Sequence, residues 1–195
     1  MAKEMFQIII FTHMKTIFKN FDKSYPLYLA CGLKDTFRES MHYIMFSNGY
    51  AYATDSHILV KARLTDISDF DEQDIALLDG KFIHANNFKK IVKSKGEVLI
   101  TSEAIVVKET EYEVAYPLKT KEQIRFPDCE NVMNKKGDVT LQVQFGISAD
   151  YLCTLSDVMN AYNGIAMEWK SNQMFVVTPI GEHKDIKGVI MTKMI

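Results

Sequence analysis

A faint internal repeat is the feature that most constrains how this chain of 195 residues can fold. The segments 82–88 (Phe-Ile-His-Ala-Asn-Asn-Phe) and 146–152 (Gly-Ile-Ser-Ala-Asp-Tyr-Leu) each read as a short apolar strand followed by Ala and by Asn or Asp. An Asn or Asp side chain at a helix start accepts a hydrogen bond from the free N–H groups of the first turn. Each segment therefore predicts the start of a short helix, and the β-rich runs behind it predict hairpins.

Three units are expected to follow one order, namely a strand, a helix and three strands. The first unit is predicted as strand Phe6–Phe11, a helix over Met14–Phe21 capped by Thr12, and strands Tyr28–Leu33, Met41–Ser47 and Tyr50–Leu64. The second continues with helix Phe88–Lys93 and strands Glu97–Thr101, Ala104–Glu109 and Tyr112–Leu118, and the third with helix Leu152–Met159 and strands Ile165–Trp169, Met174–Pro179 and Gly188–Met194. The acidic stretch Asp66–Asp79 and the segment 134–138 are expected to be solvated connections. Chance similarity among α+β hairpins is the alternative to a true repeat.

The composition is that of an ordinary globular protein, with 47% hydrophobic and 25% charged residues. A net charge of −2 excludes a generally basic nucleic-acid binder, so any DNA contact needs a local basic patch. The three cysteines, Cys31, Cys129 and Cys153, are far apart, lack metal-ligand spacing and favour a reducing compartment. The apolar start, Phe6–Phe11, is too short for a signal peptide or a membrane span, so we expect a cytoplasmic protein.

Two of the expected helices have a lysine-rich outer face, because residues three or four apart share one side of a helix. In the first helix the outer lysines are Lys15, Lys19 and Lys23, and in the second they are Lys89, Lys90 and Lys93. The outward positions of the third helix carry Thr154, Asp157 and Asn160, with no lysine. An ordinary solvated face explains either helix alone. Two such faces at the same place in a repeating unit favour a shared surface that contacts DNA phosphates.

Catalytic chemistry is not indicated. Asp55, Ser56 and His57 have the residue types of a hydrolase triad, but neighbours in a strand point to opposite faces, whereas a triad converges from separate segments. The chain has no Gly-x-Ser-x-Gly, P-loop or Gly-x-Gly-x-x-Gly motif, and its five histidines are scattered. We therefore expect no catalytic residue, no metal site and no cofactor.

Three segments, in order, resemble one protein family. They are 52–59 (Tyr-Ala-Thr-Asp-Ser-His-Ile-Leu), 124–132 (Ile-Arg-Phe-Pro-Asp-Cys-Glu-Asn-Val) and the C-terminal 188–195 (Gly-Val-Ile-Met-Thr-Lys-Met-Ile). They are similar to the Ala-Thr-Asp-Gly-His-Arg-Leu, Gly-Arg-Phe-Pro-Asp-Tyr and terminal Val-Met-Pro-Met-Arg-Leu segments of bacterial sliding clamps, the β subunit of DNA polymerase III. A weaker fourth match, 147–152, resembles the segment that opens the last helix unit of that family.

The resemblance implies an α+β, DNA-clamp-like fold, with antiparallel sheets on one side and helices on the other. Residues 1–137 would form one clamp-like domain of two units, and residues 138–195 half a domain with the third unit. The family implies a non-enzymatic processivity factor that surrounds duplex DNA and holds a DNA polymerase or other replication proteins on it. A ring of about twelve units would need roughly four copies of this chain, so the resemblance implies a homo-oligomer.

The matched segments also imply a hydrophobic pocket that accepts a peptide from partner proteins. Carried over by position, the pocket residues are Thr54, Ser56, His57, Leu59, Pro127, Val132, Ile190, Met191 and Met194. A simple core position is the alternative for Leu59 and Ile190. The chain departs from the family at Ser56, Ile58 and Thr192, where the family has Gly, Arg and Pro, so the pocket is expected to accept a different peptide or none.

Two other functions compete with a working clamp. An adaptor or decoy would keep the peptide pocket and compete for clamp-binding proteins without encircling DNA. The missing third lysine face and the shortness of the chain favour it. An enzyme on an α+β scaffold is the third possibility and has the least support.

Overall fold

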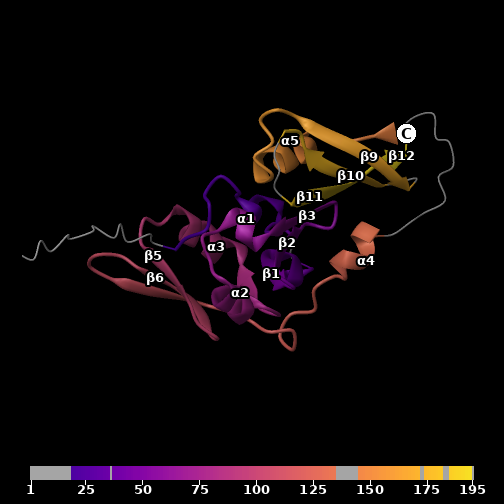
Figure 1. The fold of residues 1–195 in the computed structure, drawn as a ribbon. Coiled ribbons are helices and arrows are strands. Elements are labelled where there is room, and N and C mark those ends of the chain that lie inside the picture. Colours follow the sequence, from indigo (N-terminus) through magenta and orange to yellow (C-terminus); the bar gives the residue numbers. More distant parts are fainter. Residues whose placement is uncertain (1–18, 36, 135–144, 172–173, 182–184, 195) are drawn as a thin grey trace, which may run out of the picture.

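The computed structural model describes residues 19–35, 37–134, 145–171, 174–181 and 185–194 (Figure 1). The predicted strand Phe6–Phe11 and residues 14–18 of the predicted first helix lie outside this part of the chain. The elements are η1 (Leu27–Ala30), η2 (Glu39–His42), β1 (Tyr43–Ser47), β2 (Tyr50–Thr54), β3 (Ile58–Arg63), α1 (Leu64–Ile67), α2 (Glu72–Leu78), β4 (Phe82–His84), α3 (Ala85–Lys93), β5 (Glu97–Ile100), β6 (Ala104–Lys108), β7 (Glu113–Pro117), α4 (Cys129–Asn134), β8 (Phe145–Gly146), α5 (Ala149–Val158), β9 (Ile165–Ser171), β10 (Met174–Pro179), β11 (Ile186–Met191) and β12 (Lys193–Met194).

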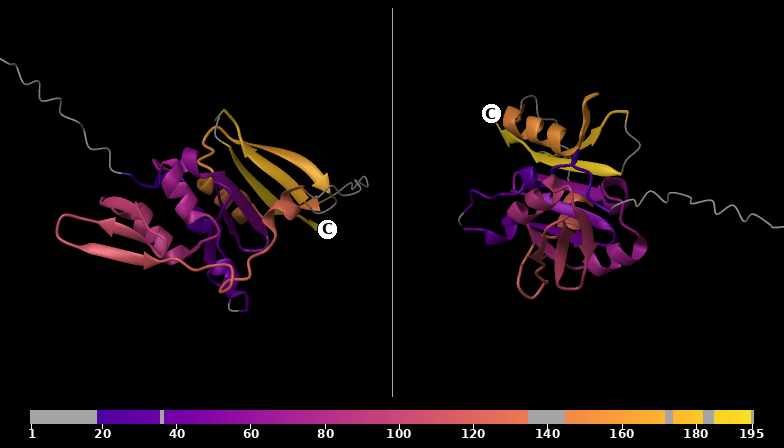
Figure 2. Two further views of the ribbon diagram at one scale, coloured as in Figure 1. Left: turned by 60° about the horizontal axis from the view of Figure 1, so that its bottom comes forward. Right: turned by 90° about the vertical axis from the view of Figure 1, so that its left-hand side faces the viewer.

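A seven-stranded antiparallel sheet, in the order β4-β1-β2-β3-β11-β10-β9, joins strands of residues 43–84 to strands of residues 165–191 (Figure 2). The junction is the pairing of β3 with β11, in which Leu59 lies opposite Val189 and Val60 opposite Gly188. Strands β5, β6 and β7 form a separate three-stranded sheet, and β12 pairs with β8. The strands of the third unit therefore extend the sheet of the first unit.

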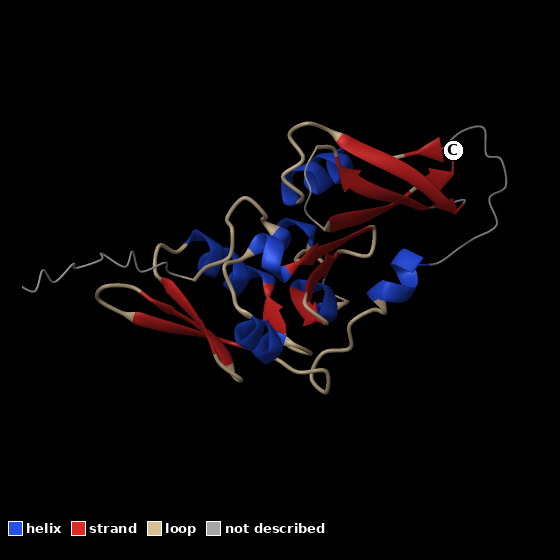
Figure 3. Ribbon diagram, viewed as in Figure 1, coloured by secondary structure: helices blue, strands red, loops and turns tan. Residues whose placement is uncertain are grey.

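Figure 3 marks the helices and strands. The largest apolar cluster contains buried side chains of α1, α2, α3 and α5, and a smaller cluster packs α4 against β2, β3 and β11. In α3, Ala85, Phe88, Ile91 and Val92 are buried on one side, as the helical spacing predicts. Helix α5 contacts η1, β3 and β11, and η1 also contacts α3 and β2. The short helix η1 thus lies between the two longer helices. In the part of the chain that the structure describes, no helix is long and apolar enough to cross a membrane.

Several predicted strands are confirmed. β10 has the predicted bounds, and β5, β6 and β7 differ from theirs by one residue at one or both ends. The predicted strand Gly188–Met194 is two strands, β11 and β12, on either side of Thr192.

The first unit differs from its expected order. Residues 27–30 form a 3-10 helix after Pro26, not the strand Tyr28–Leu33. The predicted helix over Met14–Phe21 does not extend over its described end, because the Lys19 carbonyl accepts a hydrogen bond from Val98 N–H and Phe21 bridges Ser68. The strand predicted over Tyr50–Leu64 is broken into β2 and β3 by a turn at residues 55–57.

The acidic stretch 66–79 is not a solvated connection. It contains α2, whose N-cap Asp71 accepts hydrogen bonds from Gln73 N–H and Asp74 N–H, and it buries Phe70 and Leu78. The carboxylates that resembled a charge run are partly capping groups. The expected caps at Asn86 and Asp150 are also wrong, because the N-cap positions are His84 and Ser148.

Candidate functional site

A cavity of about 260 Å³ opens where β3 meets β11. Its walls come from η2, the β2–β3 turn, β3, β11 and the segment that runs into α4. The lining residues are Met41, Thr54, Ser56, His57, Ile58, Leu59, Pro127, Cys129, Val132, Val189 and Met191. Most of them are apolar, so the cavity suits apolar side chains of a ligand better than charged groups.

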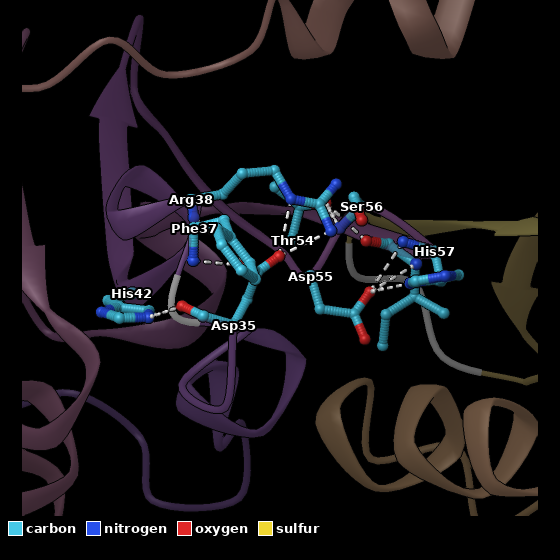
Figure 4. Close-up of polar contacts among 9 residues, drawn as sticks. Asp35, Phe37, Arg38, His42, Thr54, Asp55, Ser56 and His57 are labelled. Atoms are coloured by element: carbon cyan, nitrogen blue, oxygen red, sulfur yellow. Dashed lines mark hydrogen bonds and ion pairs between the residues drawn. The ribbon is translucent and has the colours of Figure 1, made fainter.

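The β2–β3 turn is fixed by hydrogen bonds within itself (Figure 4). Asp55 Oδ1 accepts from the backbone N–H groups of His57 and Ile58, at 2.8 and 2.9 Å. Thr54 Oγ1 accepts from Ser56 N–H at 3.0 Å and donates to the Ile58 carbonyl at 2.6 Å. The polar residues of this turn therefore set the shape of the cavity rim.

The same turn is tied to the third unit. Met191 N–H donates to the His57 carbonyl at 2.9 Å, and the His57 ring stacks on Tyr151 of α5, with ring centroids 5.4 Å apart. His57 Nδ1 and Asp55 Oδ1 are 4.0 Å apart, while that oxygen already accepts two backbone N–H groups. Residues 55–57 lie in a turn, so the strand alternation used to discount a triad does not apply. The contacts of the Asp55 carboxylate therefore give it a structural role, which is to hold the β2–β3 turn.

The opposite wall is held by Glu130 of α4. Its carboxylate accepts hydrogen bonds from the Tyr52 hydroxyl and from Lys61 Nζ, the latter at 2.5 Å. The Lys61 ammonium and the Tyr52 hydroxyl hold the pKa of Glu130 below its usual value. Burial raises the pKa of the neighbouring Cys129 thiol to about 12, so this thiol is neutral at physiological pH. Glu130 thus fixes α4, which carries Val132, against the sheet.

Seven of the nine predicted pocket residues line this one cavity. They are Thr54, Ser56, His57, Leu59, Pro127, Val132 and Met191. Ile190 is fully buried in the main core, which agrees with its alternative as a core residue. Met194 lies in β12, and its side chain is outside the described part of the structure.

Four lining residues were not predicted, namely Met41, Ile58, Cys129 and Val189. Strand alternation contained the signal for one of them, because Val189 and Met191 lie on one face of β11 and Ile190 on the other. The segment that carries Pro127 and Val132 is helix α4 from Cys129 onward.

The predicted DNA-contact lysines do not form two matching helical faces. Lys89, Lys90 and Lys93 are exposed on α3, as predicted. Lys19 is not helical, and its Nζ lies 2.6 Å from Asp71 and 2.7 Å from Asp74. These carboxylates raise the pKa of Lys19 and compensate its charge. Lys23 is exposed in a turn, and Lys15 lies outside the described residues.

The described ranges contain no group of three His, Cys, Asp or Glu side chains placed to hold a metal ion. The cavity offers a mostly apolar surface that can bind apolar groups of a ligand. The hydroxyls of Thr54 and Ser56 and the imidazole of His57 lie at one side of it.

No protein-family model and no curated protein sequence matches this chain. Solved structures do match it. The DNA polymerase III β subunit of Thermotoga maritima is 12% identical, with a TM-score of 0.56 over 90% of this chain and 64% of that chain. The β subunit of Borrelia burgdorferi is 11% identical, with a TM-score of 0.58 over 91% and 64%. The sliding clamp of Pseudomonas aeruginosa is 14% identical, with a TM-score of 0.61 over 92% and 67%.

The chain spans 64% of the length of the Thermotoga and Borrelia proteins. At sequence identities this low, the structural similarity establishes the fold alone. The described part of the chain therefore has the mixed α+β fold of the bacterial sliding clamps, as the resemblance of its sequence predicted.

Proposed function

We propose that this protein is a sliding-clamp-like processivity factor, which binds duplex DNA without reading its sequence and holds replication proteins through the cavity at the β3–β11 junction. The observation that carries the proposal is the convergence of the three clamp-like sequence segments on that one cavity. A scaffold that only shared the fold would not need these segments to meet around an open apolar hollow.

The cavity supports the binding of a peptide with apolar anchors. Met41 and Met191 line it from separate elements, and Met191 is 38% exposed at its edge. Methionine side chains are flexible and adapt to ligands of different shape. The departures at Ser56 and Ile58 alter the rim, so the peptide preferred here would differ from that of the bacterial clamps.

Helix α3 supports contact with DNA. Lys89, Lys90 and Lys93 are exposed, and within the described ranges none of them forms an ion pair. Ammonium groups without a carboxylate partner are free to replace the counterions of phosphate groups. Contacts of this kind carry no base information, so they permit sliding.

Assembly into a ring would use the free sheet edges. In the described chain β7 and β9 each pair with a strand on one side only. Edges of this kind can pair between subunits. Because each chain supplies three units, a ring of about twelve units would take roughly four chains.

The test is fluorescence anisotropy with two labelled duplexes of equal length and unrelated sequence, over a range of salt concentration. The proposal predicts equal affinities for the two duplexes and a steep fall of both with salt. A strong preference for one sequence, or binding that salt does not weaken, would contradict it.

An adaptor that binds peptides without encircling DNA is the second candidate. The ion pairs of Lys19 with Asp71 and Asp74 favour it, because they remove one of the expected DNA contacts. Selection from a displayed peptide library separates the two candidates. An adaptor would enrich peptides with apolar anchors, lose them on Met191→Glu, and show no salt-sensitive binding of duplex DNA.

A further inference from the structure

A second hollow, of about 600 Å³, lies between α3 and the β6–β7 hairpin, away from the β3–β11 junction. Its lining includes Lys89, Lys90 and Lys93 of α3 on one side and Tyr112, Val114 and Tyr116 of the hairpin on the other. Its lining combines cations, aromatic rings and aliphatic side chains. None of the roles proposed above requires this combination, because sliding on a duplex needs only the cations.

The cationic side of the hollow is the exposed face of α3. Lys89, Lys90 and Lys93 recur at helical spacing, so their ammonium groups follow one edge of the hollow. Lys89 Nζ also lies 5.6 Å from the centre of the Tyr28 ring. Three neighbouring positive charges with no ion pair in the described chain suit consecutive phosphates.

The opposite side is an aromatic wall on an edge strand. Val114 and Tyr116 are two residues apart along β7, so they share one face. Tyr112 directly precedes β7 and lines the same hollow. Tyr112 is 57% exposed and Tyr116 is half-buried, while Val107, which lies opposite Val114 in the hairpin, adds an aliphatic side chain to the lining. Exposed tyrosine rings beside lysines are the combination with which proteins bind single-stranded nucleic acid, by stacking on bases and pairing with phosphates.

One acceptor completes the site. Glu109 follows β6, and its backbone N–H donates to the Tyr112 carbonyl at 2.9 Å. Glu109 and Tyr112 both line the hollow, and the Glu109 carboxylate raises the pKa of the Tyr112 phenol. A carboxylate in a lysine-lined hollow would weaken binding of a bare phosphate, but it can accept a hydrogen bond from the amino group of a base such as cytosine.

We propose that this hollow binds an unpaired nucleotide of single-stranded DNA, with its base against Tyr112 and Tyr116 and its phosphates at Lys89, Lys90 and Lys93. A duplex keeps the faces of its bases stacked inside, so only an unpaired strand offers a base to this wall. The inference rests on the proposed function in that the same lysines are assigned to duplex contacts. It goes beyond that function by separating the two forms of DNA. The lysines contact the phosphates of both, whereas Tyr112 and Tyr116 contact only the base of a single strand.

The test measures anisotropy of labelled dC12, dT12 and a 12-base-pair duplex with the full chain at fixed salt. We expect Tyr116→Ala to weaken dC12 binding by at least about fivefold, the smallest effect of losing one stacked base, while the duplex affinity stays unchanged. Tyr116→Phe keeps the ring and should keep the affinity. Tyr162→Ala is the matched control, because Tyr162 is 89% exposed but lies outside the hollow.

Glu109→Ala gives a second readout that does not depend on the ring. It should reduce the preference for dC12 over dT12, because thymine has no amino group for the carboxylate. The inference is overturned if Tyr116→Ala weakens duplex and single strand equally, or leaves both unchanged with the fold intact by thermal unfolding. Wild-type binding of the duplex alone would refute this inference and leave the proposed function standing. Binding of the single strand alone would do the reverse.

Discussion

Replacing two lysines of α3 tests the assignment of the DNA-binding face. In the Lys89→Gln, Lys93→Gln double variant, both side chains stay polar but lose their charge. Neither lysine is buried, and neither forms an ion pair in the described chain, so we expect no measurable loss of stability.

The expected loss of DNA affinity follows from counterion release. Each phosphate contact contributes about 0.9 to the slope of log K against log salt concentration, so two lost contacts lower the slope by about 1.8. If the two proteins bind equally at 1 M salt, where the electrostatic contribution vanishes, the double variant should bind about 30-fold more weakly at 0.15 M. Charge reversal with Lys89→Glu and Lys93→Glu should abolish the salt-sensitive binding.

The assay is anisotropy with one duplex at four or more salt concentrations. Lys19→Gln is the matched control, because the Lys19 ammonium is already held by Asp71 and Asp74 and is less available to replace the counterions of a phosphate. It should change the slope much less than either α3 substitution. An unchanged slope in the α3 double variant, or an equal loss for Lys19→Gln, would refute the reasoning.

Three further substitutions test local features of the fold, each by denaturation of the purified protein. Ser56 has a φ of 76°, a left-handed conformation that costs most residues about 1–2 kcal/mol. Ser56→Gly removes this cost but increases the conformational entropy of the unfolded chain, so the substitution should stabilise the fold by up to about 1 kcal/mol. A loss of stability would contradict this. A Cβ on Gly96 would lie 2.3 Å from the Lys108 carbonyl oxygen, so Gly96→Ala should destabilise by about 1–3 kcal/mol, and a neutral result would mean that β5 and β6 separate easily there. Lys61 lowers the pKa of Glu130 in the folded state, so the ionised Glu130 stabilises the protein above its unfolded pKa of about 4.3, and this contribution is lost as the pH falls through the lower folded pKa. Glu130→Gln should therefore be less stable than wild type at pH 7 and equally stable in strong acid. An equal loss of stability at both pH values would reject this linkage.

Much of the second and third units was predictable because their signals are local. The short apolar run at the start of Met174–Pro179 predicts β10, and the spacing of Phe88, Ile91 and Val92 predicts the buried side of α3. These patterns depend on the period of one element and not on its neighbours, so they survive without knowledge of the tertiary fold.

The first unit was less predictable because tertiary contacts override its local pattern. Residues 27–30 are as apolar as a strand, yet they turn into η1 after Pro26 and pack between α3 and α5. The run from Tyr50 to Leu64 looks continuous, but hydrogen bonds to Asp55 Oδ1 break it. Short polar side chains compete for backbone groups in this way, and a hydropathy pattern does not record it.

The candidate pocket was largely accessible from sequence through three motif matches, whereas its missing members required the sheet. Val189 lines the cavity because β11 pairs with β3 in a register that places it opposite Leu59. Pairing between segments about 130 residues apart leaves no local signal. The same reason explains Lys19, whose carboxylate partners lie more than 50 residues along the chain.

The central claim, that the protein is held on DNA by surrounding it, is tested most directly by cutting the DNA. A closed circular plasmid is incubated with the protein, and the mass of protein on the DNA is measured by light scattering before and after cleavage at a single restriction site. A working clamp predicts a stable complex on the circle that is lost when the DNA becomes linear. Equal retention on circular and linear DNA, or a free chain of 22.4 kDa in both, would contradict the claim.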